Sequence, residues 1–151
     1  MSAYGNQQSN IAGGLYGVEP TISSLVVPSG VSFAFGDAVF VDAGDASKAY
    51  KADSTDASLA FRGVAVASHR SYNSVDDGSY IGYTDMNVLT EGEIYVVAAS
   101  GISAVANLAA YVVNLISDGD YGKFTSSATN AIATGGYFRS NVADGLVRIE
   151  L

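Results

Sequence analysis

Short apolar runs separated by glycine and polar residues recur along the whole chain. The runs are rich in valine, isoleucine, phenylalanine and tyrosine, and they end at Gly, Asp, Asn or Ser, which is typical of strands rather than helices. In GLVRIEL at 145–151, Leu146, Arg148 and Glu150 fall on one face and the residues between them on the other. The expected strands lie in SLVVPSG, VSFAFG, AVFVDAGD, FRGVAVAS, SYIGYTD, MNVLTEG, EIYVVAASG, AAYVVNL, GGYFRSN and GLVRIEL.

About ten short strands at this spacing predict an all-β fold, a single-domain β-sandwich or barrel of jelly-roll type. The first residues are polar and glycine-containing and show no apolar period, so an extended N-terminal arm is expected over 1–24. The β domain is expected over 25–151. The uncharged segment 94–116 is long enough to cross a membrane. Acidic residues flank it on both sides, however, so two strands joined by a turn are expected and no membrane partner.

An internal repeat is suggested by a shift of 72 residues. It aligns 34–68 with 106–140 without a gap, and the matches include Lys51 with Lys123 and Gly63 with Gly135. Each segment contains an apolar strand, an acidic turn, a lysine, a Ser/Thr/Asn loop and a strand that begins at glycine. We hypothesise that the two segments form related β units within one domain.

The charge of the chain argues against nucleic acid as a partner. Fifteen acidic and seven basic residues give a net charge of −8, and the basic residues are scattered rather than clustered. Phosphate binding requires clustered Lys and Arg. There is no cysteine, which removes disulfides, thiolate metal sites and cysteine nucleophiles.

The acidic residues do not form a recognisable metal or catalytic motif. Loops starting at Asp42, Asp53 or Asp118 lack the glycine and glutamate positions of a calcium-binding EF-hand. The carboxylate pairs Asp76/Asp77 and Glu91/Glu93 are interpreted as solvated turn residues rather than as an acid–base pair. His69 is the only histidine, which leaves no second imidazole for a metal and no nucleophile motif beside it. We therefore expect no enzyme activity, no cofactor and no metal.

The order of several motifs resembles the phage capsid cement or head-decoration proteins. The motifs are IAGGLYGVEP in the arm, then FGDAVFVD, FRGVAVAS, MNVLTEGEIYVVA, AAYVVN, GKFT, GGYFRSN and GLVRIEL, and together they cover most of 11–151. One departure is that the second Gly-Asp expected before AAYVV is Asn107-Leu108-Ala109, so a different turn geometry is conceivable there.

The resemblance implies a structural protein of the virion that binds the outer surface of an icosahedral head and stabilises contacts between major capsid subunits. It also implies a homodimer or homotrimer, and it leaves both states open. A phage tail or fibre component, or another surface β module, is the alternative, and a glycan hydrolase with two carboxylates is a third possibility. The residues expected to contact the capsid or a neighbouring copy are Tyr4, Ile11, Leu15, Tyr16 and Val18.

Overall fold

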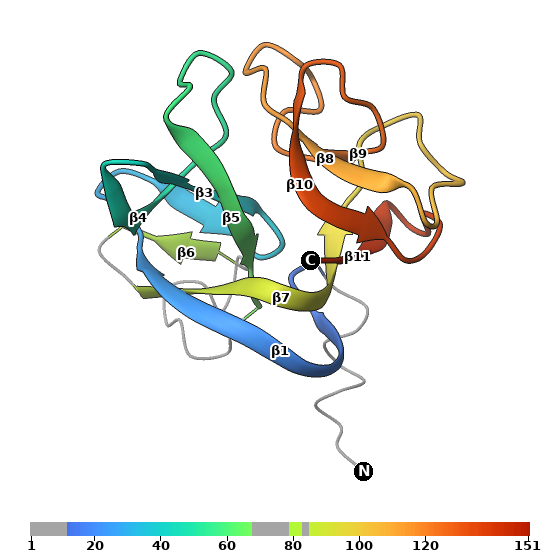
Figure 1. The fold of residues 1–151 in the computed structure, drawn as a ribbon, viewed down its shortest axis with the longest axis horizontal. Coiled ribbons are helices and arrows are strands. Elements are labelled where there is room, and N and C mark those ends of the chain that lie inside the picture. Colours follow the sequence, from blue (N-terminus) through green and yellow to red (C-terminus); the bar gives the residue numbers. More distant parts are fainter. Residues whose placement is uncertain (1–11, 68–78, 83–84) are drawn as a thin grey trace.

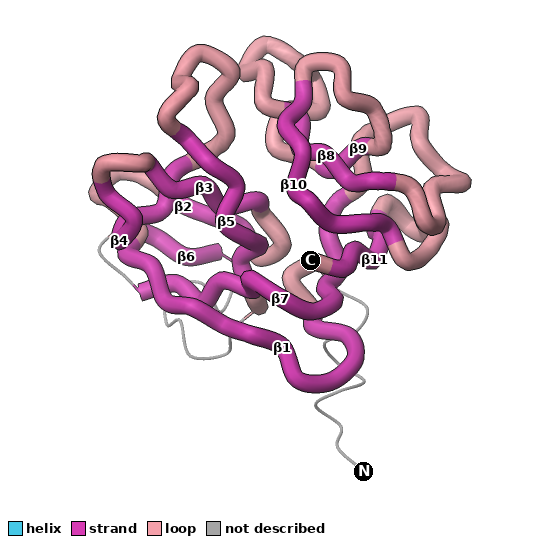
Figure 2. Tube along the Cα trace, viewed as in Figure 1, coloured by secondary structure: helices cyan, strands magenta, loops and turns pink. Residues whose placement is uncertain are grey.

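The computed structural model of the 151-residue chain describes residues 12–67, 79–82 and 85–151. These ranges form eleven strands and no helix, which confirms the predicted all-β fold (Figures 1 and 2). The strands of the first half are β1 (Leu15–Val26), β2 (Ser32–Ala34), β3 (Ala38–Asp42), β4 (Asp45–Tyr50), β5 (Leu59–Ala65) and β6 (Ser79–Ile81). They are followed by β7 (Asp85–Val97), β8 (Ala109–Val113), β9 (Phe124–Thr125), β10 (Ala131–Phe138) and β11 (Leu146–Glu150).

Strand β7 runs through the middle of the molecule and belongs to two groups of strands (Figure 1). The sequence predicted two strands here, MNVLTEG and EIYVVAASG, with a junction at Gly92. That prediction is wrong, because the chain continues as one 13-residue strand through Gly92, which has a φ of +130°. Glycine tolerates this backbone conformation, so the strand can change direction without ending. Residues of β7 before Gly92 pair with β5, and residues after it pair with β11.

The first group of strands closes into a ring, here called the N-terminal unit (residues 15–91). Its order is β1, β4, β3, β5 and the first half of β7, and β7 then pairs antiparallel with β1. The ring is completed by a parallel pairing of Val26 in β1 with Lys48 in β4. The small sheet of β2 and β6 lies beside it, and its residues Phe33 and Tyr80 belong to the core inside the ring.

The second group, here called the C-terminal unit (residues 93–151), follows the same path. Its order is β9, β8, β10, β11 and the second half of β7. Ala98, just after β7, forms a parallel bridge with Phe124 of β9, and the Ala99 N–H donates to the Phe124 carbonyl over 2.8 Å. This bridge occupies the place of the Val26–Lys48 pairing in the N-terminal unit.

The two units share a pattern of strand pairing. Strands β3 and β5 pair antiparallel, and so do β8 and β10, which lie about 72 residues later. A glycine in each unit also lets two strands approach closely. A Cβ added to Gly63 of β5 would lie 2.0 Å from the Leu89 carbonyl oxygen, and one added to Gly136 of β10 would lie 2.3 Å from that of Glu150.

The turn before β8 has the same geometry as the turn before β3, although its sequence lacks Gly-Asp. Gly36 has a φ of +88° and Asn107 a φ of +71°. The Gly36 N–H donates to Ala65 over 2.8 Å, as the Asn107 N–H does to Phe138 over 2.8 Å. Asparagine is among the few residues with a side chain that tolerate this left-handed conformation. Asn107-Leu108 therefore replaces Gly36-Asp37 without changing the turn.

Two hydrophobic cores follow from this arrangement. The smaller core fills the N-terminal unit and contains Val39, Ala65 and Val88. The larger core combines the interior of the C-terminal unit, including Phe138 and Ile149, with the opposite face of β3, β5 and β7 in the N-terminal unit. The paired parts of β3, β5 and β7 in the N-terminal unit are thus buried on both faces, whereas the sheet of the C-terminal unit is buried on one.

Two segments singled out in the sequence analysis can be located in the fold. Residues 15–24, assigned to the arm, form most of β1 and pair along β7, so the β domain begins ten residues earlier than expected. The uncharged segment 94–116 contains the end of β7 and the whole of β8, as two strands. Within the described ranges no helix has the length and apolar character needed to cross a bilayer.

Candidate functional site

The C-terminal unit presents the outward face of its sheet to solvent. Ile94 and Val96 of β7 and Val147 and Ile149 of β11 are fully buried, and the residues between them point outward. Strand register places these outward side chains next to one another, because Arg148 pairs with Tyr95 and Glu150 pairs with both Glu93 and Tyr137. We call this surface the β11 face, and it consists of Glu93, Tyr95, Tyr137, Arg139, Leu146, Arg148 and Glu150, with Tyr16 over it. Leu108 lies at its rim, because the preceding residue Asn107 bonds with Arg139 and the following residue Ala109 pairs with Tyr137.

Arg148 lies at the centre of the β11 face and contacts several residues around it. Its Nε donates to Glu93 Oε1 over 2.9 Å, and its Nη2 donates to the Arg139 carbonyl over 3.1 Å. The guanidinium carbon lies 3.9 Å from the centroid of the Tyr16 ring, within cation–π range. Burial acts to lower the pKa of Arg148, but hydrogen bonds with Tyr95 and Glu93 and the negative charge of Glu93 outweigh it and raise that pKa above its ordinary value.

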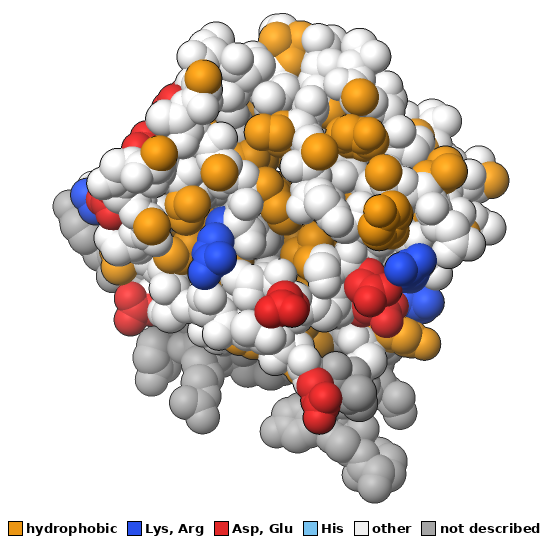
Figure 3. Space-filling model, in the orientation of Figure 1, with side chains coloured by type: hydrophobic (Ala, Val, Ile, Leu, Met, Phe, Trp, Pro, Cys, Tyr) orange, Lys and Arg blue, Asp and Glu red, His pale blue; other side chains and the backbone are white. Residues whose placement is uncertain are grey.

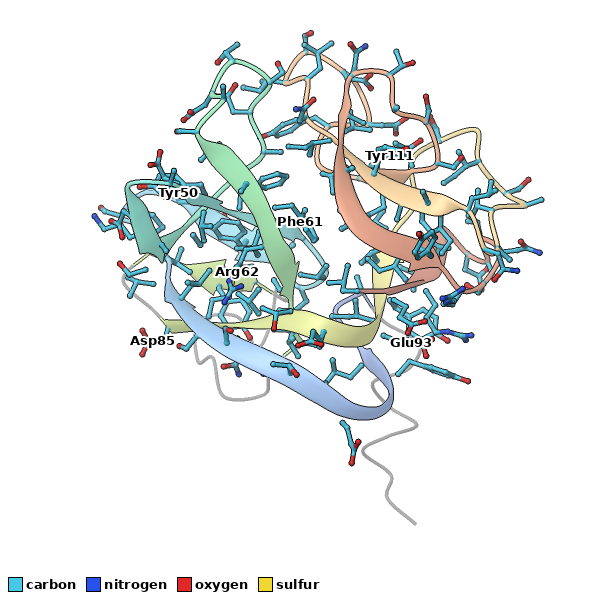
Figure 4. All side chains as sticks on the ribbon, viewed as in Figure 1. Tyr50, Phe61, Arg62, Asp85, Glu93 and Tyr111 are labelled. Carbon is cyan, nitrogen blue, oxygen red and sulfur yellow. The ribbon has the colours of Figure 1, made fainter. Side chains whose placement is uncertain are left out.

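A second arginine, just after β10, repeats this arrangement. Arg139 Nε donates to Glu150 Oε1 over 2.6 Å, and its Nη1 donates to Asn107 Oδ1 over 3.2 Å. The guanidinium also lies 5.6 Å from the centroid of the Tyr137 ring. Figure 3 shows basic and acidic side chains meeting in this corner of the molecule, over β10 and β11, and Figure 4 places Glu93 there.

The β11 face is electrically neutral on an acidic protein. Its two arginines are matched by its two glutamates, so the net charge of −8 is carried by the rest of the chain. Tyrosine and arginine are the residues most enriched at the energetic centres of protein interfaces. The composition of the face is therefore that of a contact surface rather than of an ordinary solvated face.

The face also carries exposed apolar area and a hollow. Tyr137 and Leu108 are each 48% exposed although both have large apolar side chains. Beside Tyr95 and Leu146 lies a cavity of about 300 Å³ that opens to solvent, and it is lined further by Ser140, Asn141, Ala143 and Asp144. It adjoins the β11 face at Tyr95 and Leu146, and Asp144 adds a carboxylate that the balance of two arginines and two glutamates does not include.

The internal repeat shows how unusual this exposure is. Val64 pairs with Leu89 in the N-terminal unit as Tyr137 pairs with Glu150 in the C-terminal unit. Val64 and Leu89 are fully buried, because the core of the C-terminal unit covers them. The equivalent positions on the β11 face carry Tyr137 and Glu150 instead and remain open to solvent.

The five predicted contact residues have different positions. Tyr4 and Ile11 lie outside the described residues, and Val18 lies within β1. Leu15 is half-buried and packs against the larger core, so its side chain points into the protein. Tyr16 is 42% exposed and lies on the β11 face, where its ring also meets Tyr95 edge-on at 6.2 Å between centroids.

The chain enters the fold through a tightly held strap at Ala12–Gly14. The Gly13 N–H donates to the Tyr95 carbonyl over 2.7 Å, and the Tyr95 N–H donates to the Gly14 carbonyl over 3.0 Å. On its other side, the Gly13 carbonyl accepts from Ala67 N–H over 2.9 Å. The strap thus joins both units, and the only sign of it in the sequence is the Gly-Gly pair of IAGGLYG.

The aspartates between 42 and 56 stabilise turns. Each accepts a hydrogen bond on its side chain from the backbone N–H two residues later, a pattern in which the carboxylate imitates a backbone turn. The pairs are Gly44 to Asp42, Ser47 to Asp45, Thr55 to Asp53 and Ser58 to Asp56. Among the described residues, no group of three or more His, Asp or Glu side chains is placed to hold a metal ion. His69, Asp76 and Asp77 lie outside the described residues, and Glu93 is paired with Arg148.

These turns predict a loss of stability in acid. The Gly44 amide holds the pKa of Asp42 below its ordinary value, and the Thr55 amide does the same for Asp53. A carboxylate with a lowered folded-state pKa contributes stability above the unfolded-state pKa and loses it as the pH falls through the folded-state pKa. We expect the Tm to fall as the pH is lowered below about 4. An Asp42→Asn/Asp53→Asn double variant is expected to have a lower Tm at pH 7 and a smaller fall in acid. An equal fall in both proteins would contradict this.

A second cavity, of about 280 Å³, lies between the two units. Lys51 and Lys123, which occupy equivalent places in the repeat, both line it. Lys51 Nζ lies 2.8 Å from Asp37 Oδ2, and Lys123 Nζ lies 3.2 Å from Asp120 Oδ1. Each ammonium group is therefore neutralised within its own unit, and the cavity offers much less to a partner than the β11 face does.

Comparison with known proteins places these features in context. The sequence profile described as "Structural cement protein (E217 gp24/Pam3 gp6)" matches residues 2–151. A solved structure titled "The capsid of Myoviridae Phage XM1" contains a chain with a similar fold, at a TM-score of 0.74 and 20% sequence identity. The similarity covers 95% of this chain and 90% of that one. The search of curated proteins finds no match.

Proposed function

The chain belongs to the phage structural cement protein family, and from this we propose that it binds the outer surface of the capsid across contacts between major capsid subunits. The observation that carries the proposal is the family match over residues 2–151, nearly the whole chain. A structural protein associated with the capsid is what that family description supports, rather than a tail or fibre component. The proposed role requires no catalytic step and no cofactor.

The chemistry of the molecule suits such a role. A shell offers many equivalent sites, so contacts that are weak individually gain from being repeated and linked. A net charge of −8 keeps the free protein soluble and away from packaged DNA, and the neutral β11 face leaves one surface free of that repulsion. We propose that the protein acts as a homodimer or homotrimer, since closed symmetry matches the two-fold and three-fold positions of an icosahedral shell.

The direct test is binding to heads that lack the protein. Purified protein mixed with such heads is expected to sediment with them, and the decorated heads are expected to retain DNA to a higher temperature than bare heads. Heads that already carry the protein supply the matched control, because their binding sites are filled and they are expected to take up no more of it. If the protein stays in the supernatant at all concentrations tested, the proposed function is wrong.

The N-terminal arm is proposed to add a second contact, through Tyr4 and Ile11. The strap at Ala12–Gly14 shows where a deletion has to stop, because residues from Leu15 onward pair with β7. We expect deletion of residues 2–11 to weaken head binding by about tenfold or more, as loss of one of two linked contacts does, with an unchanged Tm. Co-sedimentation and differential scanning fluorimetry measure the two quantities. Unchanged affinity would exclude a latching role for the arm.

A further inference from the structure

We propose that the β11 face is the surface of the body that contacts the capsid, and that the hollow beside Tyr95 and Leu146 receives one large apolar side chain of a major capsid subunit. The inference rests on the proposed function and adds to it a named surface and the kind of contact made there. The first three arguments do not involve the arm, because every residue used in them lies in the described part of the chain.

The first argument is electrostatic. Two partners of unlike composition approach most easily where neither presents uncompensated charge, because burying an unpaired charge is costly. On the β11 face each arginine already has its own glutamate, at 2.9 Å for Arg148–Glu93 and 2.6 Å for Arg139–Glu150. A partner therefore need not supply counter-charges for these four side chains, and Asp144 in the lining of the hollow is the additional carboxylate that it would meet.

The second argument concerns the repeat. In the N-terminal unit, the positions equivalent to Tyr137 and Glu150 are covered by the other half of the molecule. The C-terminal unit has no third unit to cover its outward face. Instead of becoming uniformly polar, this face keeps Leu108 and Tyr137 half-exposed. Large exposed apolar groups set among paired charges are typical of a surface that is covered in an assembly.

The third argument concerns the shape of the hollow. A volume of about 300 Å³ is at the lower end for small-molecule sites, which span about 300–1,000 Å³. Its lining combines the apolar side chains of Leu146 and Ala143 with the polar groups of Tyr95, Ser140, Asn141 and Asp144. A hollow with this mixed lining can hold one aromatic or aliphatic side chain of a partner, with polar groups around it. Side chains that fill pockets in this way often contribute most of the binding energy of an interface.

The strap adds a reason to assign the face to the capsid. Gly13 and Gly14 are hydrogen-bonded to the backbone of Tyr95, the residue that also lines the hollow. Any partner engaged by the arm is therefore held next to the β11 face at a high effective concentration. One capsid subunit, or two adjacent subunits, could then be contacted by both elements.

The test uses substitutions at exposed positions, each with a matched control. Ala143→Trp fills the hollow, and Ala128→Trp places the same side chain on an exposed loop elsewhere. Leu108→Ser removes an exposed apolar group from the rim of the face, and Ile116→Ser removes one that is 61% exposed beyond the other end of β8. We expect both face variants to bind heads at least about tenfold more weakly than the wild type, and both controls to bind normally.

Cross-linking keeps the test informative if a substitution alters folding. The chain has no cysteine, so Ala143→Cys carries a single thiol for a short photo-crosslinker, and Ala128→Cys is its control. The expected product joins this chain to the major capsid protein from position 143 and not from position 128. A product joining two copies of this chain from position 143, or face variants that bind heads as tightly as the wild type, would overturn the inference. Wild-type protein that fails to bind heads would instead overturn the proposed function.

Discussion

Alanine at Gly63 is expected to destabilise the protein by about 3 kcal/mol or more, enough to leave much of it unfolded. The added Cβ would lie 2.0 Å from the Leu89 carbonyl oxygen and 3.0 Å from its carbonyl carbon. These atoms belong to the backbone of a central strand and cannot swing aside as a flexible side chain would. The pairing of β5 with β7 would have to open, which disturbs both cores at once. Circular dichroism during thermal unfolding measures the effect.

Gly119→Ala is the matched control for this substitution. Gly119 has no atom within 4 Å of an added Cβ, and its φ lies outside the left-handed range. Alanine there is expected to change stability by less than about 1 kcal/mol, and it can even stabilise by restricting the unfolded chain. If Gly63→Ala unfolded at the same temperature as Gly119→Ala, the close approach of β5 to β7 would be wrong.

Alanine at Gly13 is expected to release the strap from the body of the protein. An added Cβ would lie 2.8 Å from Gly36 N and 2.9 Å from both Ala65 O and Ala67 N, and the φ of +76° adds strain of its own. Left-handed backbone costs about 1–2 kcal/mol for a residue with a Cβ, and the overlap costs about 1–3 kcal/mol more. We expect a lower Tm together with faster amide exchange at Tyr95, whose N–H is bonded to Gly14.

The variant Gly30→Ala separates the cost of the left-handed backbone from the cost of the steric overlap at Gly13. Gly30 has the same φ of +76° but no atom within 4 Å of an added Cβ, so alanine there carries only the conformational strain. The difference in unfolding free energy between the two variants therefore measures the overlap at the strap. Equal destabilisation by Gly13→Ala and Gly30→Ala would show that the strap is not confined between Gly36 and Ala67.

The strand pattern predicted most of the fold, because alternation reports directly on burial. In GLVRIEL the predicted outward residues Leu146, Arg148 and Glu150 are half-buried, and Val147 and Ile149 between them are fully buried. The prediction failed where glycine was interpreted as a strand end. Gly92 lies inside β7, since glycine serves both to end a strand and to bend one, and the sequence alone does not distinguish the two.

The extent of the arm could not be predicted because β1 does not look like a buried strand. Along its length Ile22 and Val26 are 40% exposed, and polar residues separate them. Gly17 and Glu19 have positive φ values, which interrupt the pairing with β7 and remove any regular alternation. Backbone hydrogen bonds to β7 hold β1 in place. Backbone hydrogen bonding does not require apolar side chains, so the hydrophobic pattern of the sequence does not reveal this strand.

The β11 face was only partly accessible from sequence. Tyr16 was predicted as a contact residue, but its neighbours Arg148 and Tyr95 come from strands more than 70 residues further along the chain. Strand register decides which side chains meet, and a shift of one residue would turn every one of them to the other side. The family resemblance, now confirmed, identified the kind of protein without identifying the surface that it uses.

The shared strand β7 has a mechanical consequence. A capsid wall under internal pressure pulls its accessory proteins sideways, and a protein made of two separately folded modules would yield first at its linker. Here the two units have no linker, because the last strand of one continues as the first strand of the other. Tension applied between the units would be carried along the covalent backbone of β7 and shared among the hydrogen bonds on both of its edges. The weakest point under load is therefore expected to lie outside the junction of the two units.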